Sequence, residues 1–181
     1  MNFKNILITI IFLIIPSKSF ALIEVDITRG NLNPLPIAIS SLSSDNATKN
    51  QLNKLIKIND VGLEISKVIE NNFRQTGLFN PLDKDSFLQK PDIAHLKPRF
   101  EDWSLIKAQA LITGKVTYTE EKLRVEFRLW DVLAAKEMMA LAFTTVPKNW
   151  RRVGHIISDK VYERLTGERG YFDTRIIYVS E

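Results

Sequence analysis

The sequence predicts an α/β domain in which helices pack against an antiparallel sheet. Three strand-like segments, 110–119, 122–130 and 137–146, follow one another with short connections. Segments with helical periodicity, 60–75 and 147–166, stand before and after them. A sheet with one apolar face needs a cover, and an amphipathic helix needs a surface to pack on. These segments therefore predict one domain with a sheet at its core.

The middle strand alternates between apolar and charged side chains. Its two faces are Leu123, Val125, Phe127 and Leu129 on one side, and Lys122, Arg124, Glu126 and Arg128 on the other. A two-residue period gives a strand one buried and one solvated face, which is typical of antiparallel sheets. The connection at Glu120 and Glu121 is short enough for a hairpin, so the three strands form a meander.

Composition limits the classes of function. The chain has 181 residues, of which 45% are hydrophobic and 25% charged, as in an ordinary globular domain with short appendages. The formal charge is +4, and Lys4 and Lys18 account for two of these charges. About +2 is left for the rest, which is not the excess expected of a nucleic-acid-binding protein. The absence of cysteine excludes disulfides, thiolate metal sites and lipid-anchored cysteines.

The first 21 residues have the layout of a secretory signal peptide. Lys4 precedes an unbroken apolar run over 6–15, and small residues, Ser19 and Ala21, occupy the positions that a signal peptidase reads. A membrane anchor is the alternative, but ten helical residues span only about 15 Å of a hydrocarbon core about 30 Å thick. We expect cleavage after Ala21, so that the mature chain starts at Leu22 outside the cytoplasm.

Two short strands are expected next. Residues 23–27 alternate like a strand and end near Gly30. Such a strand either pairs within its own domain or adds itself to the open sheet edge of another protein. Residues 36–39 are apolar throughout, as in a buried strand, and the polar stretch 40–53 predicts a loop.

The first helix is predicted over 60–75. Its apolar face consists of Val61, Ile65, Val68, Ile69 and Phe73. Asn59 can cap its start, and Gly77 can supply the left-handed residue that ends it. Residues 79–82 lead out of this helix, and a weak strand is expected between them and Phe87.

The remaining elements follow from prolines and apolar spacing. The stretch 89–98, with two prolines, predicts a surface loop, and 101–108 predicts a short helix that buries Trp103 and Ile106. Pro147 can open the last helix. The apolar stripe of that helix is Trp150, Val153, Ile157, Val161 and Leu165, and Gly167 ends it. A further strand is expected over 174–179.

Candidate catalytic residues are few. His155, Asp159 and Glu163 are spaced by four and share a helix face, so they are a possible metal site, although we favour a solvated polar face. Thr113-Gly114-Lys115 lacks the upstream glycine of a phosphate-binding loop. We therefore expect no enzyme and no cofactor.

Five stretches form more specific motifs. The longest is 165–179, which reads Leu-Thr-Gly-Glu-Arg-Gly-Tyr-Phe-Asp-Thr-Arg-Ile-Ile-Tyr-Val. The others are 76–82, 110–116 with Gly114, 127–132, and His155 with Ser158 and Asp159. Together they resemble the TolB family of the Tol–Pal system, over the chain from the signal peptide to the last residue. The resemblance implies a mixed five-stranded sheet with flanking helices, like the anticodon-binding domains of tRNA synthetases.

The resemblance also implies a division of the chain. Residues 1–21 are the signal peptide, 22–35 a segment that docks the protein TolA, and 36–167 the α/β domain. Residues 168–181 are then the linker and first strand of a β-propeller that is missing here. Ser40-Ser41 and Ala135 depart from the family pattern. If the turn at Ala135 needs a positive φ, alanine costs about 1 kcal/mol there.

The function implied is that of a non-catalytic periplasmic adaptor in outer-membrane integrity and envelope constriction at cell division. In the family, the N-terminal segment docks the C-terminal domain of TolA, and the propeller docks the lipoprotein Pal. The matching TolA-docking residues are Leu22, Ile23, Glu24, Val25, Asp26, Ile27 and Gly30. This chain would keep the TolA contact and lose the Pal contact.

Three other interpretations stay open from the sequence. The fold analogy suggests an RNA-binding domain, which the export signal and the small net charge disfavour. A hydrolase that uses His155, Asp159 and Glu163 would need a bound metal. The chain is alternatively an inactive product of a split gene.

Overall fold

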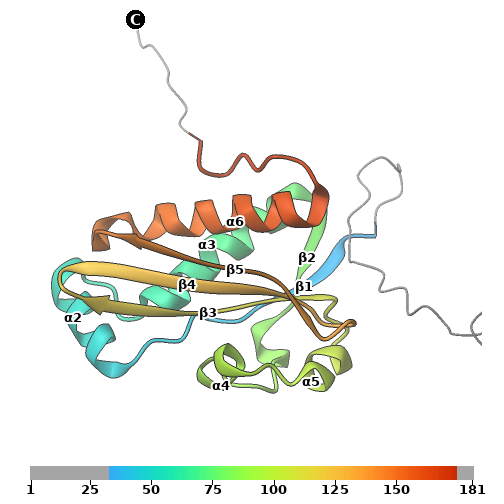
Figure 1. Ribbon diagram of the computed structural model, residues 1–181, viewed down its shortest axis with the longest axis horizontal. Coiled ribbons are helices and arrows are strands. Elements are labelled where there is room, and N and C mark those ends of the chain that lie inside the picture. The colour runs from blue at the N-terminus through green and yellow to red at the C-terminus, as the bar shows by residue number, and fades with distance from the viewer. Residues whose placement is uncertain (1–32, 175–181) are drawn as a thin grey trace, which may run out of the picture.

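A mixed sheet of five strands forms the middle of the computed structural model, which describes residues 33–174 (Figure 1). The strand order is β2-β1-β3-β4-β5. The strands are β1 (Leu35–Ile39), β2 (Phe79–Pro81), β3 (Ala110–Thr119), β4 (Lys122–Asp131) and β5 (Lys136–Thr145). The predicted fold class, a mixed five-stranded sheet with flanking helices, is confirmed.

Parallel and antiparallel pairing meet at β3. β1 runs parallel to both β2 and β3, and β3, β4 and β5 form the predicted antiparallel meander. Glu120 and Glu121 join β3 to β4 with φ of 50° and 61°. Two positive φ angles in a two-residue loop match the twist of an antiparallel pair, which explains the tight hairpin.

One face of the sheet is covered by α3 (Val61–Thr76) and α6 (Trp150–Thr166), which lie side by side in Figure 1. The apolar side chains of β4 point toward this layer and are at most 1% exposed. Both helices end at a left-handed glycine, as predicted, with φ of 69° at Gly77 and 75° at Gly167. The predicted cap Asn59 is wrong, because the Asp60 carboxylate accepts the hydrogen bond from Leu63 N instead, at 3.0 Å.

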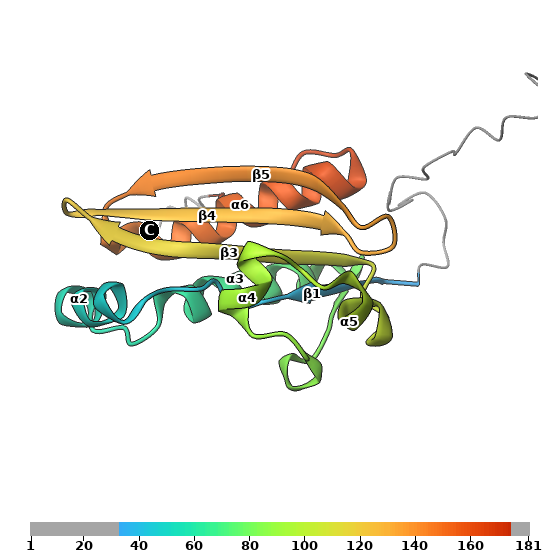
Figure 2. The same cartoon turned by 60° about the horizontal axis from the view of Figure 1, so that its bottom comes forward.

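The opposite face is covered only in part, by α4 (Pro91–Leu96) and α5 (Phe100–Leu105). In Figure 2 these helices lie over β1 and β3, and β4 and β5 extend beyond them. Trp103 is buried, as predicted, and its Nε1 donates to the Gln89 side chain at 3.1 Å. The loop predicted over 89–98 is wrong, because Pro91 starts α4 and Ala94 packs beside Trp103.

Two other local predictions fail. The stretch 40–53, expected to be a loop, contains most of α2 (Asn46–Ile56), in which only Thr48 and Leu52 are buried. Asp45 caps this helix by accepting a hydrogen bond from Thr48 N at 2.7 Å, and this bond lowers the pKa of Asp45. The weak strand expected before Phe87 lies earlier, as β2, and the 3₁₀ turn η1 (Lys84–Ser86) follows it.

The start of the last helix also differs slightly from the prediction. Pro147 opens the 3₁₀ turn η2 (Pro147–Asn149), which leads directly into α6. The predicted stripe of α6 is buried from Val153 to Leu165, and Trp150 packs against the core from its edge. Among the helices of residues 33–174, none is both long enough and apolar enough to cross a membrane.

Candidate functional site

The residues predicted to bind TolA lie outside the described part of the chain, as do the two signal-cleavage residues. These are Leu22, Ile23, Glu24, Val25, Asp26, Ile27 and Gly30, with Ser19 and Ala21 before them. The strand expected over 174–179 also lies outside it, except for Thr174. The site described below therefore consists of the surfaces that the folded domain offers at α6 and at the edge of the sheet.

The possible metal ligands on α6 have three separate partners. His155 Nδ1 lies 3.1 Å from Asn72 Nδ2, and Glu163 pairs with Lys160 at 3.0 Å. Asp159 accepts hydrogen bonds from main-chain amides after the helix. No group of three or more potential ligands is arranged for a metal within residues 33–174. The structure therefore gives the metal-dependent hydrolase hypothesis no ligand set.

His155 belongs to a buried polar network between α3 and α6. Asn72 Nδ2 donates to Ser158 Oγ at 2.8 Å, and Ser158 Oγ donates to the carbonyl of Gly154 at 2.9 Å. Gly154 lets the helices approach closely, because a Cβ there would lie 2.8 Å from Val68 Cγ1. A hydrogen-bonded network of this kind fixes how two helices pack. The motif of His155, Ser158 and Asp159 thus includes residues that join helices.

Residues 168–174, here called the linker strap, fold back along α6. The Asp159 carboxylate accepts from Phe172 N at 2.6 Å and from Asp173 N at 3.1 Å. Arg152 binds Asp173 with both Nε and Nη2 at 3.1 Å, and this carboxylate raises the pKa of Arg152. Gly170 passes so close that a Cβ would lie 2.4 Å from Asp159 Cα. The end of the domain is therefore held against its last helix.

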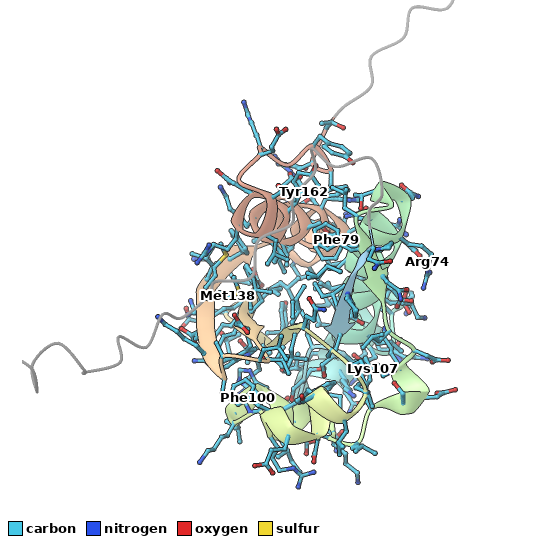
Figure 3. The ribbon with its side chains drawn as sticks, turned by 90° about the vertical axis from the view of Figure 1, so that its right-hand side faces the viewer. Arg74, Phe79, Phe100, Lys107, Met138 and Tyr162 are labelled. Carbon is cyan, nitrogen blue, oxygen red and sulfur yellow. The ribbon has the colours of Figure 1, made fainter. Side chains whose placement is uncertain are left out.

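Aromatic side chains secure the strap from the other side. Phe172 lies edge-on to Phe73 and Tyr162, with ring centroids 6.1 Å and 5.9 Å away, and Tyr171 lies 5.6 Å from Tyr162. Figure 3 shows Tyr162 on α6 next to Phe79 of β2, which is 6.1 Å from it. Burial raises the pKa of Tyr162, and the nearby Tyr171 and Glu168 add to this effect. Sequence reasoning missed this cluster because its members come from four different elements.

The uncovered part of the sheet contains a cavity of about 200 Å³. Its lining residues are His95, Glu126, Phe127, Arg128, Ala140, Leu141 and Ala142. His95 comes from α4 and is buried, and its Nδ1 has no hydrogen-bond partner within the described chain. Burial lowers the pKa of His95, and the charge of Arg128 lowers it further. No sequence pattern predicted this cavity, since alternating alanines on a strand are common.

The elements above define an α/β sandwich domain with a mixed five-stranded sheet. A family model for the TolB amino-terminal domain matches residues 23–138. The chain therefore belongs to the TolB amino-terminal domain family. The matched range includes most of the predicted docking segment.

Two known proteins illustrate the relationship. The chain is 78% identical over 172 residues to a Tol-Pal system protein TolB from Pelagibacter ubique (strain HTCC1062). That alignment covers 95% of this chain and 39% of the relative, so the chain spans well under half of the relative's length. The crystal structure of TolB from Acinetobacter baumannii matches with a TM-score of 0.61 and 20% identity, over 84% of this chain and 33% of that one. This second similarity confirms the fold.

Proposed function

We propose that this chain is a non-catalytic, partner-binding domain of a Tol–Pal envelope system, located in the periplasm. The observation that carries the proposal is its 78% identity to a protein named for that system. In this role the chain contributes to outer-membrane integrity and to envelope constriction at division. It acts by contacts between proteins and needs no cofactor.

The contact proposed for this chain is with the C-terminal domain of TolA, through residues 22–30. Ile23, Val25 and Ile27 alternate with Glu24 and Asp26, which suits a strand added to another sheet. Main-chain hydrogen bonds would supply much of the affinity, and the apolar side chains would set the register. The family match begins at residue 23, which supports a role for this segment in the family domain.

The folded domain begins only a few residues after that segment. β1 begins at Leu35, whose N donates to the Leu78 carbonyl at 2.9 Å. Residues 22–30 therefore precede the sheet by a few residues only. A short connection raises the effective concentration of the domain near any partner bound by the segment. A Pal contact is proposed only for the longer relatives, through the part that this alignment does not cover.

The TolA contact is tested by calorimetric titration of TolA's C-terminal domain with two forms of this chain, starting at Leu22 and at Asn31. We expect binding by the first form and a loss of about 100-fold or more in the second, because the whole added strand is removed. Equal affinity of both forms would show that residues 22–30 do not bind TolA.

Matched substitutions separate strand addition from simple charge attraction. Val25→Pro removes a main-chain donor and should weaken binding by about tenfold or more. Glu24→Gln leaves the main chain intact and should change the affinity by less than about threefold. If Glu24→Gln had the larger effect, the contact would be electrostatic.

The proposed location has its own test, the intact mass of the protein from the periplasmic fraction of its source cells. A chain that begins at Leu22 is expected. A chain that retains Met1 and is recovered from the cytoplasm would contradict both export and the adaptor role.

A further inference from the structure

β5 is the free edge of the sheet on the side away from β2. Figure 2 shows it as the outermost strand, and in Figure 3 Met138 marks its position at the side of the molecule. An edge strand directs half of its N–H and C=O groups away from the sheet. At the start of β5, Arg164 Nε reaches the Met138 carbonyl at 3.4 Å. Beyond that point, no other strand of the described residues pairs with this edge.

From Met139 onward, the edge lacks the features that normally prevent pairing with another chain. Lysines, prolines and bulges usually interrupt such strands. Residues 138–146 contain no charged side chain and no proline. The irregularity in the β4–β5 register falls between Leu129 and Trp130, so pairing is regular from Met139 to Thr145. A seven-residue, uncharged and regular edge is long enough to accept another strand.

The two faces of β5 differ in chemistry. On the side of α6, Leu141 lies opposite Phe127 and remains 40% exposed. On the other side, Ala140 lies opposite Arg128, and Ala142 lies opposite Glu126. The two small side chains leave the cavity described above open beside His95. An added strand would therefore contact apolar side chains on one face. On the other face it would contact this polar cavity, here called the hollow.

The hollow lies in positively charged surroundings. The strand alternation puts four cations on this face of β3 and β4, which are Lys115, Lys122, Arg124 and Arg128. Two acids share the face, and both are paired, Glu126 with Arg124 at 2.9 Å and Glu137 with Arg128 at 3.1 Å. Lys115 and Lys122 form no ion pair among residues 33–174, although the charge of Lys115 also acts on Asp45. The face thus has a positive excess.

We propose that β5 is a docking edge for an extended segment of another protein in which apolar and acidic residues alternate. Main-chain bonds join the segment to Met139–Thr145, its apolar side chains cover Leu141, and an acidic side chain enters the hollow beside Arg128. This contact is separate from the proposed TolA contact, which uses a different segment of the chain.

The isotope-labelled chain, starting at Leu22, is titrated with two synthetic peptides, acetyl-Thr-Ile-Glu-Ile-Glu-Ile-Thr-amide and its counterpart with lysine in place of glutamate. We expect amide shifts and slower hydrogen exchange in Met139–Thr145 with the glutamate peptide, and affinity at least about tenfold weaker for the lysine peptide. Equal binding of both peptides, or no change in β5 at millimolar glutamate peptide, would overturn the proposal.

Variants on exposed positions test the two faces separately. Arg124→Glu should lower the affinity for the glutamate peptide and raise the affinity for the lysine peptide. Ala142→Trp should block the hollow and lower the affinity for the glutamate peptide. Lys54→Glu, an exposed lysine on α2, is the control for net charge and should change neither affinity by more than about twofold. If Lys54→Glu acted like Arg124→Glu, docking at β5 would be contradicted.

Two other occupants of the β5 edge would each overturn the proposal. Dimerisation in analytical ultracentrifugation that Ala142→Trp abolishes would assign the edge to a second copy of the chain. Protection of β5 amides in the free chain that Val25→Pro removes would assign it to residues 23–27, which have the same alternation. A monomeric chain with unprotected β5 amides, and with peptide binding as described, supports the docking edge.

Discussion

Ala135 lies at the end of the turn between β4 and β5 with a φ of 50°. An L-residue in this left-handed conformation brings its Cβ close to the following carbonyl oxygen. The sequence departure at this position therefore has a local energetic cost, as expected.

Ala135→Gly should raise the Tm by about 2 °C, because glycine relieves roughly 1 kcal/mol of strain in a chain of this length. Thermal unfolding followed by circular dichroism measures the change. Ala134→Gly is the matched control, since Ala134 has no positive φ and its N donates to Asp131 Oδ1 at 2.8 Å. Ala134→Gly should lower the Tm. An equal rise of the Tm in both variants would contradict backbone strain at Ala135.

His95 should make stability depend on pH. Burial and Arg128 lower the pKa of His95 in the folded chain, so the unfolded chain binds a proton more readily. The stabilisation is fully present above pH about 6.5, the ordinary value, and is lost as the pH falls from there toward the lower folded pKa. Urea midpoints between pH 7 and 5 measure this fall.

His95→Gln should flatten that pH profile, and His155→Gln is the control with the other histidine of the chain. An unchanged slope in His95→Gln would show that other groups produce the pH dependence. Two other charged groups also act on the pKa of His95. Lys115 lowers this pKa and Glu126 raises it.

At the scale of elements, periodicity predicted those structures that bury a continuous face. β3, β4, α3 and α6 all do so, whereas β5, which has no fully buried residue, was identified by its place after β4 in the meander. α2 and α4 escaped prediction because their burial rests on few residues, Thr48 and Leu52 in α2, and Ala94 and His95 in α4. β2 has three residues and ends in Pro81, so no alternation identified it. Tertiary contacts, rather than local pattern, fix these elements.

Gly154→Ala tests the close packing of α3 and α6. Alanine favours a helix by about 1 kcal/mol over glycine, but its Cβ would lie 2.8 Å from the stiff side chain of Val68. We expect the steric cost to win and the free energy of unfolding to fall by about 1–2 kcal/mol in urea titration.

Adding Val68→Ala to Gly154→Ala makes room for the new methyl group. The double variant should lose less stability than the two single variants together, since the residues are in contact. Strict additivity would mean that the helices do not meet at this point.

At the scale of the molecule, the strap determines how the chain leaves the domain. Asp159 was predicted as a possible metal ligand on a polar face, and its actual partners are two amides of residues that follow the helix. The solvated face predicted from the spacing of polar residues is wrong for two of its three members, because His155 contacts Asn72 and residues after the helix fold onto Asp159, and only Glu163 is exposed. The cavity beside His95 was missed for the same reason, because α4 and β5 are far apart in sequence.

Asp159→Ala should loosen the strap without unfolding the domain. Hydrogen bonds to a charged acceptor contribute about 1.5–3 kcal/mol, so amide exchange at Phe172 and Asp173 should accelerate by about tenfold or more. Amides in the middle of α6 should keep their exchange rates.

Glu163→Ala, one turn further along α6, serves as the control because Glu163 pairs only with Lys160 in the described chain. It should leave the strap unchanged. Equal exchange in Asp159→Ala and the parent chain would assign the hold on the strap to Arg152 and the aromatic side chains alone.

The position of β1 has a consequence for the order of folding. β1 lies between β2 and β3, and Ile37 pairs with Ala110, about seventy residues later. Closing so long a loop is slow, whereas the β3–β4–β5 meander needs only local contacts. Until β3 pairs with it, β1 is therefore an apolar segment that lacks its second neighbour in the sheet. Exposed apolar strands of this kind are the part of a folding chain most prone to aggregate, so we expect aggregation during refolding to start at Leu35–Ile39.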